Sequence, residues 1–220
     1  MGVVLDRKIS VALDLIDTRF AKKICRALVV GCGGAAEVLA MAERFDCEVV
    51  GIDISDELFP PNDDPRVTLM VVDAAKMPFP DAHFDLIYSF HALEHIARLD
   101  DALQEMRRVL APAGAVFVGT PNKSRVVGYI GADASLSEKL RWNLDDWKMR
   151  LLGRWDNAEG AHAGFTRTEL ARIVERAFGR AEDHTFAYYD RLYARHQAVL
   201  RALSRAGLAD LALPAVYVSN

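Results

Sequence analysis

Residues 27–41 read ALVVGCGGAAEVLAM, and this stretch decides the fold. The apolar run at residues 27–30 predicts a buried strand, glycines interrupt it within residues 31–34, and good helix formers follow from Ala35. A strand, a glycine turn and a helix in this order are typical of a ligand-binding turn, because glycine has no Cβ and lets a ligand approach the backbone. The helix N-terminus adds unpaired N–H groups and a positive dipole end. We therefore expect a polar or anionic ligand at this turn.

Strands and helices alternate on both sides of this stretch. Apolar residues at helical spacing from Leu5 to Phe20 predict an amphipathic helix before the first strand, and residues 35–45 predict the first crossover helix. The alternation predicts an α/β fold with a mostly parallel, doubly wound sheet and right-handed crossovers. Further strands are expected at residues 48–53, 66–73, 84–90 and 115–120.

Another helix is expected between the last two of these strands. Asp100 or Asp101 is placed to cap its N-terminus, and Gln104 can complete a capping box with Asp101. Pro112 and Gly114 are expected to end it.

The C-terminal part of the chain is expected to return to the same alternation. Thr166 or Thr168 opens a helix with an apolar stripe on one face. The other elements expected here are a strand at residues 181–189, a helix at residues 192–203 and a last strand at residues 213–218.

Composition excludes several classes of protein. With 51% hydrophobic and 26% charged residues, the 220-residue chain can bury a sizeable core. A net charge of −4 without a basic stripe argues against a nucleic-acid partner. No apolar run reaches the roughly 18 residues of a membrane span, and charges interrupt the N-terminus too early for a signal peptide. The three cysteines show no metal or disulfide spacing, so we expect a cytoplasmic protein.

Two acidic residues close consecutive expected strands. Asp53 follows the glycine turn by about 20 residues, the offset of a ribose-binding acid, and Asp73 ends the next strand. The carboxyl ends of parallel strands share one edge of the sheet, where ligands of doubly wound folds bind. Asp53 can accept both hydroxyls of a ribose, and Asp73 can accept an N–H from an adenine amino group. The glycine turn and both acids therefore predict a nucleoside site.

Four segments together carry a family resemblance: VVGCGGAAEVL, then GIDIS, then VVDAAKMPFPDAHFDLIYSFHALEHI, then RVLAPAGAVFVGTPN. They resemble the class I S-adenosylmethionine-dependent methyltransferases, most closely the small-molecule enzymes of the type 11 and type 23 domain groups. The resemblance is strong over residues 27–122 and weaker over residues 162–179. It implies a Rossmann-like, seven-stranded sheet whose last strand is antiparallel, which PAVYVSN at residues 214–220 can supply.

The resemblance also implies S-adenosylmethionine as the cofactor and a set of residues that bind it. The glycine turn would hold the methionine and ribose parts, Asp53 the ribose diol, and Asp73 with Ala74 the adenine, against which Met77 would pack. The end of the fourth strand, at Ser89 and the next two residues, would lie near the transferred methyl. The complete expected set is Gly31, Cys32, Gly33, Asp53, Ile54, Asp73, Ala74, Met77 and Ser89.

Two positions depart from the family pattern. The family has an acid two residues before its first glycine, where this chain has Val29, and a third glycine where it has Ala35. Val29 removes a carboxylate that would orient the cofactor, whereas Ala35 adds only a methyl group. We expect weaker cofactor binding unless other groups compensate.

Residues 121–164 break the alternation and carry aromatic residues. A departure of this length inside a compact domain is usually functional, and it leaves a strand at its carboxyl end. We interpret residues 123–164 as an insertion after strand five that forms a lid over the substrate; alternatively, it packs on a distant surface or builds a dimer interface. The other parts of this single domain, residues 1–220, are an N-terminal helix (1–24), a cofactor-binding half (25–122) and C-terminal helices and strands (165–220).

Catalysis by such an enzyme rests on alignment of the acceptor with an already activated methyl group. A hydroxyl acceptor also needs a general base, for which histidine is the usual residue, so His91 and His162 are the candidates. The expected reaction is methyl transfer to oxygen, nitrogen or carbon of a small or medium-sized metabolite. An oligomer is compatible with the sequence.

Other interpretations of the same motifs remain. The glycine turn also fits the G-x-G-x-x-G/A pattern of an NAD(P)-dependent oxidoreductase, and a methyltransferase-like domain can bind without catalysis. Residues 91–95 read HALEH and formally fit H-x-x-E-H, a zinc-protease pattern that requires a helix and a further ligand. Because the motif directly follows an expected strand, we expect no metal.

Overall fold

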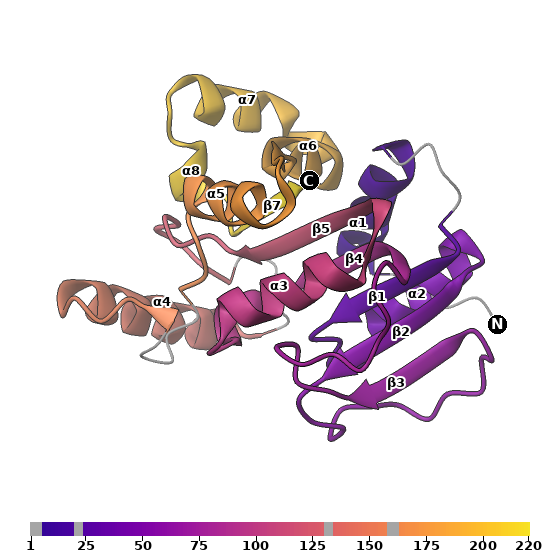
Figure 1. Cartoon of the computed structure of the whole chain (residues 1–220). Coiled ribbons are helices and arrows are strands. Elements are labelled where there is room, and N and C mark those ends of the chain that lie inside the picture. The colour runs from indigo at the N-terminus through magenta and orange to yellow at the C-terminus, as the bar shows by residue number, and fades with distance from the viewer. Residues whose placement is uncertain (1–5, 20–23, 130–133, 158–162) are drawn as a thin grey trace.

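The computed structural model describes residues 6–19, 24–129, 134–157 and 163–220. Its centre is a seven-stranded sheet of order β3-β2-β1-β4-β5-β7-β6 (Figure 1). The five strands from β3 to β5 pair in parallel, and β7 runs antiparallel between β5 and β6. This confirms the expected doubly wound sheet with an antiparallel last strand. The strands are β1 (Arg26–Val30), β2 (Glu48–Asp53), β3 (Val67–Val71), β4 (Phe84–Phe90), β5 (Leu110–Pro121), β6 (Glu182–Asp183) and β7 (Ala215–Ser219).

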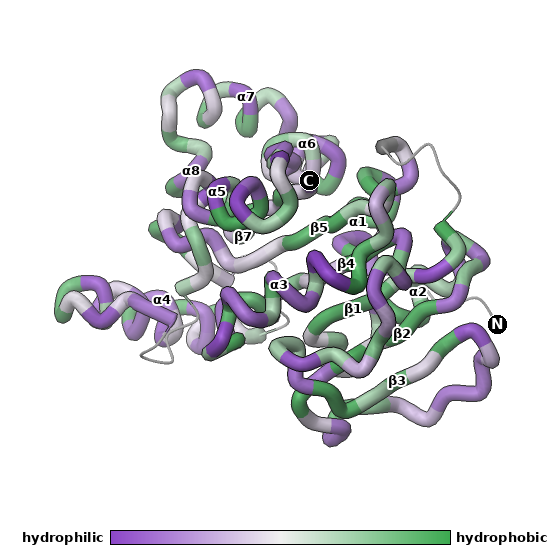
Figure 2. The backbone as a smooth tube through the Cα atoms, in the orientation of Figure 1, coloured by the Kyte–Doolittle hydropathy of each residue, from purple (hydrophilic) through white to green (hydrophobic). Residues whose placement is uncertain are grey.

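Helices cover both faces of this sheet and make three layers. One apolar core lies under α1, α2 and α6, and a second under α3 and α5. The strands between them are strongly hydrophobic, as the green of β1 shows (Figure 2). The helices are α1 (Arg7–Arg19), α2 (Ala36–Phe45), α3 (Leu99–Val109), α4 (Leu136–Leu151), α5 (Arg167–Phe178), α6 (Thr185–Leu192), α7 (Gln197–Arg205) and α8 (Ala209–Ala212), with 3₁₀ turns η1 (Leu93–His95) and η3 (Ala194–His196).

The strand expected at residues 181–189 is wrong over most of its length. Only Glu182 and Asp183 pair with β7, and helix α6 begins at Thr185, whose N–H the Asp183 carboxylate accepts at 2.9 Å. The tyrosines of this segment favour a strand by propensity. Helical spacing instead brings Tyr188, Tyr189 and Leu192 onto one buried face, so packing overrides propensity.

The expected boundaries of α3 are also wrong. The helix begins at Leu99 with Arg98 at the N-cap and no side-chain cap, so Asp101 and Gln104 form no capping box. The helix ends at Val109, and β5 starts at Leu110. Pro112 and Gly114 therefore lie inside the strand, where the pairing with β4 is irregular between Phe84 and Leu86.

The insertion after β5 holds one long helix, α4, which projects beyond the edge at which the parallel strands end (Figure 1). A capping box between Ser135 and Glu138 starts it. The chain then returns to the sheet beside Asn122, which forms a parallel bridge with Phe165. Thr166 caps α5 together with Glu169, as expected for one of the two threonines.

Gly164 makes this return possible. Its φ is +74°, and a Cβ built there would lie 1.8 Å from the carbonyl oxygen of Pro121. That carbonyl also accepts the N–H of Phe165 at 3.1 Å, so it cannot move without loss of the bridge. Only glycine fits both the conformation and the space.

Gly164→Ala should therefore destabilise the fold by about 3 kcal/mol or more, since it combines a left-handed alanine with a backbone clash. Gly179→Ala is the matched control: its φ is +83° with nothing within 4 Å, so it should cost only about 1 kcal/mol. Urea unfolding of both variants measures the difference. Equal losses of stability in the two variants would show that the expected clash between a Cβ at residue 164 and the carbonyl of Pro121 does not destabilise the fold.

Candidate active site

A cavity of about 490 Å³ opens at the carboxyl ends of β1, β2 and β4. Its volume lies within the range of small-molecule sites. We name it the first cavity. The residues that line it are Val30, Gly31, Gly33, Ile52, Asp53, Ile54, Val72, Asp73, Ala74, His91, Ala92, His95, Ile96, Ala97 and Arg98. It brings together six of the nine expected cofactor residues: Gly31, Gly33, Asp53, Ile54, Asp73 and Ala74.

Asp53 holds the glycine turn in place from the neighbouring strand. Its carboxylate accepts the N–H of Gly33 at 2.8 Å and that of Ile54 at 2.7 Å. The N–H groups of Gly31 and Cys32 are bound by the carbonyl of Ile52. Most of the backbone N–H groups that we expected to be available to a ligand at this turn therefore form hydrogen bonds within the protein. The half-buried carboxylate of Asp53 and the exposed side chain of Ile54 form this wall of the cavity instead.

Asp73 lies across the cavity in an ion pair. It accepts the N–H of Ala75 at 2.8 Å and a guanidinium N–H of Arg98 at 2.6 Å. These two contacts, the amide first, lower the pKa of Asp73 below its usual value. The carboxylate is ionised at neutral pH and can act only as an acceptor.

The other three expected cofactor residues are buried and do not line this cavity. Ser89 donates its hydroxyl to the carbonyl of Val30 at 3.0 Å, and Met77 packs in the core beneath α3. Cys32 faces the core on the other side of the sheet, where burial raises its pKa to about 12. Such a thiol stays protonated.

The two departures from the family pattern lie beside the same turn. Val29 is buried in the apolar core, and Ala35 precedes α2 with a φ of +58°. Glu37, in the first turn of α2, is half-buried, and burial raises its pKa above the usual value.

A second cavity of about 380 Å³ shares His91 with the first. His91 has a φ of +54° and donates its backbone N–H to the carbonyl of Gly119 at 2.9 Å, which fixes this residue at the end of β4. Of the residues expected to take part in catalysis, His91 thus lies at the junction of both cavities, and His162 lies outside the described residues. The second cavity is lined by Lys8, Phe90, His91, Pro121, Arg125, Tyr129, Tyr188, Tyr189, Leu192, Tyr193, Pro214, Ala215 and Tyr217.

Aromatic side chains dominate the walls of the second cavity. The rings of Tyr188 and Tyr217 stack at 3.9 Å, and Tyr189 stacks on Tyr193 at 5.7 Å. Their hydroxyls are engaged: Tyr188 donates to the carbonyl of Lys8 at 3.2 Å, and Tyr189 accepts the N–H of Ala215 at 2.8 Å. Sequence reasoning missed this wall because TFAYYDRLY, at residues 185–193, was interpreted as a strand followed by a helix; its tyrosine spacing was the available signal.

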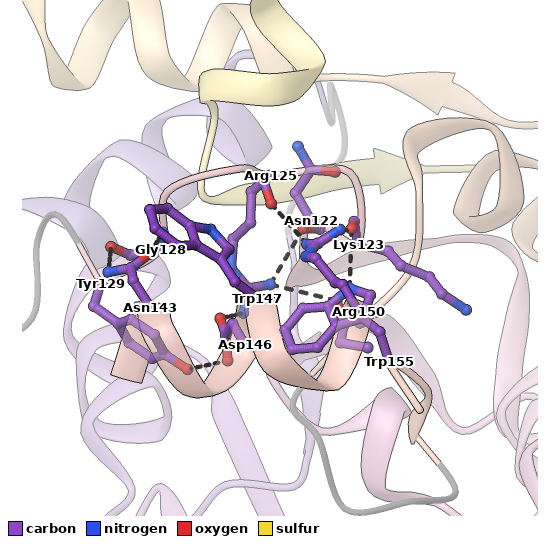
Figure 3. Close-up of polar contacts among 12 residues, drawn as sticks. Asn122, Lys123, Arg125, Gly128, Tyr129, Asn143, Asp146, Trp147, Arg150 and Trp155 are labelled. Atoms are coloured by element: carbon purple, nitrogen blue, oxygen red, sulfur yellow. Dashed lines mark hydrogen bonds and ion pairs between the residues drawn. The ribbon is translucent and has the colours of Figure 1, made fainter. Parts of the chain in front are cut away.

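The insertion supplies one end of this cavity through Arg125 and Tyr129. Arg125 is 5% exposed, and its guanidinium lies 3.3 Å from the carboxylate of Asp146 on α4 (Figure 3). Tyr129 donates its hydroxyl to the other oxygen of Asp146 at 3.1 Å. Burial raises the pKa of Asp146, and the charge of Arg125 opposes that rise. One carboxylate on α4 thereby positions both cavity residues.

The HALEH motif does not form a metal-binding helix. His91 ends the strand in a left-handed conformation, and only the single 3₁₀ turn η1 follows. Within the residues that the structure describes, no cluster of three histidine, cysteine or acidic side chains is arranged to hold a metal ion. Glu94 is buried, neither of its oxygens has a hydrogen-bond partner in the described part of the chain, and His95 Nε2 lies 3.8 Å from one of them.

Comparisons of the sequence with known proteins find methyltransferases. The sequence model of the methyltransferase domain matches residues 28–118. The 27-O-demethylrifamycin SV methyltransferase of Amycolatopsis mediterranei (strain S699) is 32% identical over 102 residues, which cover 43% of this chain and 38% of that enzyme. The ajmaline N-methyltransferase of Rauvolfia serpentina is 31% identical over 140 residues, covering 60% and 45% respectively. The chain thus spans less than half the length of each of these relatives.

A solved structure shares the whole fold. The putative methyltransferase from an antibiotic biosynthesis pathway of Anabaena variabilis ATCC 29413 superposes with a TM-score of 0.63, at 14% identity and with 96% of both chains covered. Across the four described stretches of the chain, no helix combines the length and hydropathy that a bilayer crossing requires.

Glu94 should make the stability of the fold depend on pH. Burial raises its pKa from 4.5 to about 7 in the folded chain. Below pH 4.5 the carboxyl is protonated in both states; as the pH rises, the unfolded chain ionises first, so stability falls until about pH 7 and stays lower above it. Glu94→Gln should gain about 3 kcal/mol relative to the native chain between pH 4.5 and pH 8, measured by urea unfolding.

Glu43→Gln is the control for the substitution itself, because Glu43 is exposed and its replacement should change the free energy of unfolding at neutral pH by no more than about 0.5 kcal/mol. Parallel stability curves for the native chain and Glu94→Gln would show that Glu94 ionises normally in the folded state.

Proposed function

The chain belongs to the class I S-adenosylmethionine-dependent methyltransferases, and on that premise we propose that it transfers a methyl group from S-adenosylmethionine to a small or medium-sized acceptor in the second cavity. The observation that carries this proposal is the position of His91 in the walls of both cavities. A two-substrate reaction needs two sites that meet at the reacting atoms.

The residues of the first cavity fit the cofactor. Asp53 faces the space beside the glycine turn as a half-buried acceptor, which suits a ribose diol, and the exposed Ile54 next to it suits the face of a purine ring. Asp73 is an ionised acceptor and suits the adenine amino group. When bound, S-adenosylmethionine supplies a methyl group already activated on a sulfonium. Gly33 and Gly34 leave room at the turn, since a Cβ on either would meet nothing closer than 4.0 Å.

His91 is proposed as the general base. In this role its imidazole takes the proton that a hydroxyl or amine acceptor loses when the methyl group is attached. The hydrogen bond from its backbone N–H to the carbonyl of Gly119 holds the residue at the boundary between the two cavities. His162 remains a second candidate from the sequence.

The segment after β5 is proposed to close over the acceptor. Its Arg125 and Tyr129 line the second cavity, and both are fixed to α4 through Asp146. A closed aromatic cavity excludes water from a reactive sulfonium and strengthens every electrostatic contact inside. These contacts favour the lid over an insertion that packs far from the site.

The chemistry of the second cavity favours an acceptor with a substantial apolar or aromatic body. Five tyrosines, Phe90 and Leu192 offer ring faces and apolar edges, and two cationic side chains, Lys8 and Arg125, complete the wall. The named relatives methylate a rifamycin at oxygen and an alkaloid at nitrogen, so the family leaves the accepting atom open.

Asp53→Ala should weaken the binding of S-adenosylhomocysteine by about 2 kcal/mol, the scale of lost hydrogen bonds to a charged acceptor. Calorimetric titration measures this affinity, and a parallel titration with NAD tests the oxidoreductase alternative. Asp63→Ala, at an exposed carboxylate outside the cavity, is the control and should bind like the native chain. Native affinity in Asp53→Ala would remove this residue from the site, and tight binding of NAD without S-adenosylhomocysteine would overturn the proposed function.

His91→Asn should lower kcat for a hydroxyl acceptor by about 10²-fold or more while S-adenosylhomocysteine affinity stays within a few-fold. Asparagine accepts the left-handed backbone of this position better than most residues, so the strand end is preserved. Acceptors come from a screen with methyl-labelled S-adenosylmethionine. An unchanged kcat across the pH range would assign proton transfer to another group.

A further inference from the structure

Two of the three cysteines of the chain lie side by side at the amino-terminal ends of neighbouring strands. Cys25 directly precedes β1 and Cys47 directly precedes β2, and these strands are adjacent in the sheet (Figure 1). The parallel register pairs Arg26 with Glu48, so Cys25 and Cys47 form the next pair along the same ladder. The N–H of Glu48 donates to the carbonyl of Cys25 at 3.0 Å, which extends the ladder to this point. The spacing of the cysteines in the sequence gave no sign of this proximity.

The side chains of both cysteines lie on the face of the sheet that α1 and α2 cover. Side chains alternate between the two faces along a strand. Ala27 of β1 and Val49 of β2 belong to the core under α1 and α2, and Cys25 and Cys47 each stand two residues earlier. Cys47 is itself part of that core. Burial, and after it the nearby Cys25 thiol, raises the pKa of Cys47 to about 11, so the two sulfurs are close enough to influence each other.

Backbone contacts hold the two cysteines at this spacing. The Asp85 carboxylate of β4 accepts the N–H groups of Cys25 and Arg26 at 2.9 and 3.0 Å. Asp46 ends α2 with a φ of +47°, and β2 begins two residues later. Neighbouring strands lie about 4.8 Å apart, and a disulfide spans about 4.4–6.8 Å between Cα atoms. A bond between the two sulfurs therefore fits the sheet as it stands.

Both cysteines line one shallow cavity of about 470 Å³ on the protein surface, which we name the third cavity. Cys25 is exposed there, whereas Cys47 is only 4% exposed. A small molecule that enters this cavity therefore meets the Cys25 thiol first and finds Cys47 beside it. The residues that line the third cavity are Cys25, Arg26, Asp46, Cys47, Glu48 and Arg66.

We propose that Cys25 and Cys47 are a redox modification site, at which the two thiols form an intramolecular disulfide by exchange with a small-molecule disulfide. The Cys25 thiolate attacks one sulfur of the small disulfide, breaks its S–S bond and expels one thiolate. The Cys47 thiolate then attacks the Cys25 sulfur and expels the second thiolate. The two cysteines are oxidised, the small disulfide is reduced to two thiols, and the protons that the cysteines lose pass to the departing thiolates.

The new bond closes the segment of the chain that carries the glycine turn. Residues 25–47 contain β1, this turn and α2. A cross-link across such a loop restricts the unfolded chain and thereby stabilises the folded one. The third cavity lies at the amino-terminal ends of β1 and β2, and the first cavity lies at their carboxyl ends. The modification therefore stabilises the domain and leaves the expected cofactor residues uncovered.

Peptide mapping of the native chain after incubation with oxidised glutathione tests the proposal. We expect a disulfide between the peptides of Cys25 and Cys47, and an unfolding midpoint raised by roughly 6–12 °C over the reduced chain. Cys25→Ser should abolish both effects. Cys32→Ala is the matched control, because Cys32 is buried beside the glycine turn, and this variant should form the disulfide like the native chain. The reaction needs no cofactor or acceptor, so it tests this site independently of methyl transfer.

The second step of the exchange has a signature of its own. Only a thiolate attacks, and burial keeps the Cys47 thiol protonated at neutral pH. Around this thiol, Arg66 favours the thiolate, whereas Asp85 and Asp46 oppose it. Closure of the mixed disulfide on Cys25, followed by mass spectrometry, should therefore become about tenfold faster per pH unit from about pH 7 to pH 9. A mixed disulfide that persists on Cys25, or a bond that joins two copies of the chain through Cys25, would overturn the proposal.

Discussion

The bond between the Asp53 carboxylate and the N–H of Gly33, 2.8 Å long, is the contact on which the site depends. Between β1 and α2 the chain reverses through three residues with positive φ: Gly31, Gly33 and Ala35. The two glycines adopt this conformation freely, whereas Ala35 costs about 1 kcal/mol and is held because its methyl group is fully buried. A carboxylate on the adjacent strand fastens this strained turn to the sheet. The acid that fits a ribose therefore also builds the wall that the ribose would meet.

Local patterns in the sequence predicted the parts of the fold that are decided locally. The strands at residues 48–53 and 84–90 agree residue for residue with β2 and β4, since each is a short apolar run bounded by turn residues. The cap at Thr166 agrees for the same reason. The segment that became α6 was mispredicted, because the burial of Tyr188 and Tyr189 against β7 and α1 decides its conformation and no short window of sequence contains those partners.

The two cavities differ in the same way: local sequence determines the first, and long-range packing determines the second. The first cavity is built from turns and strand ends within residues 30–98. Six of its residues were predicted: the glycine turn, Asp53 and Asp73 from their positions at strand ends, and Ile54 and Ala74 from the family resemblance. The second cavity joins Lys8 to Tyr188, which are 180 residues apart, and adds Arg125 from the insertion. Only the three-dimensional arrangement brings these residues together. Met77 and Ser89 lie at the expected sequence positions, but both side chains are buried and are not among the residues that line the first cavity.

Helix α4 is attached to the rest of the protein mainly through polar side chains, whereas its leucines are exposed. Burying the Arg125–Asp146 pair costs desolvation that the ion pair offsets only in part, so an apolar contact would hold this helix at least as well. Helix propensity does not explain the leucines either, because lysine and glutamate form helices about as well, yet Leu136, Leu140, Leu144 and Leu151 share one exposed side of α4 while Trp142 packs against Tyr129. Asn143, Trp147 and Arg150 form hydrogen bonds with residues 123–128, and these bonds set the rotation of α4 about its own axis. They thereby determine on which side of the helix Leu140 and Leu144 are exposed.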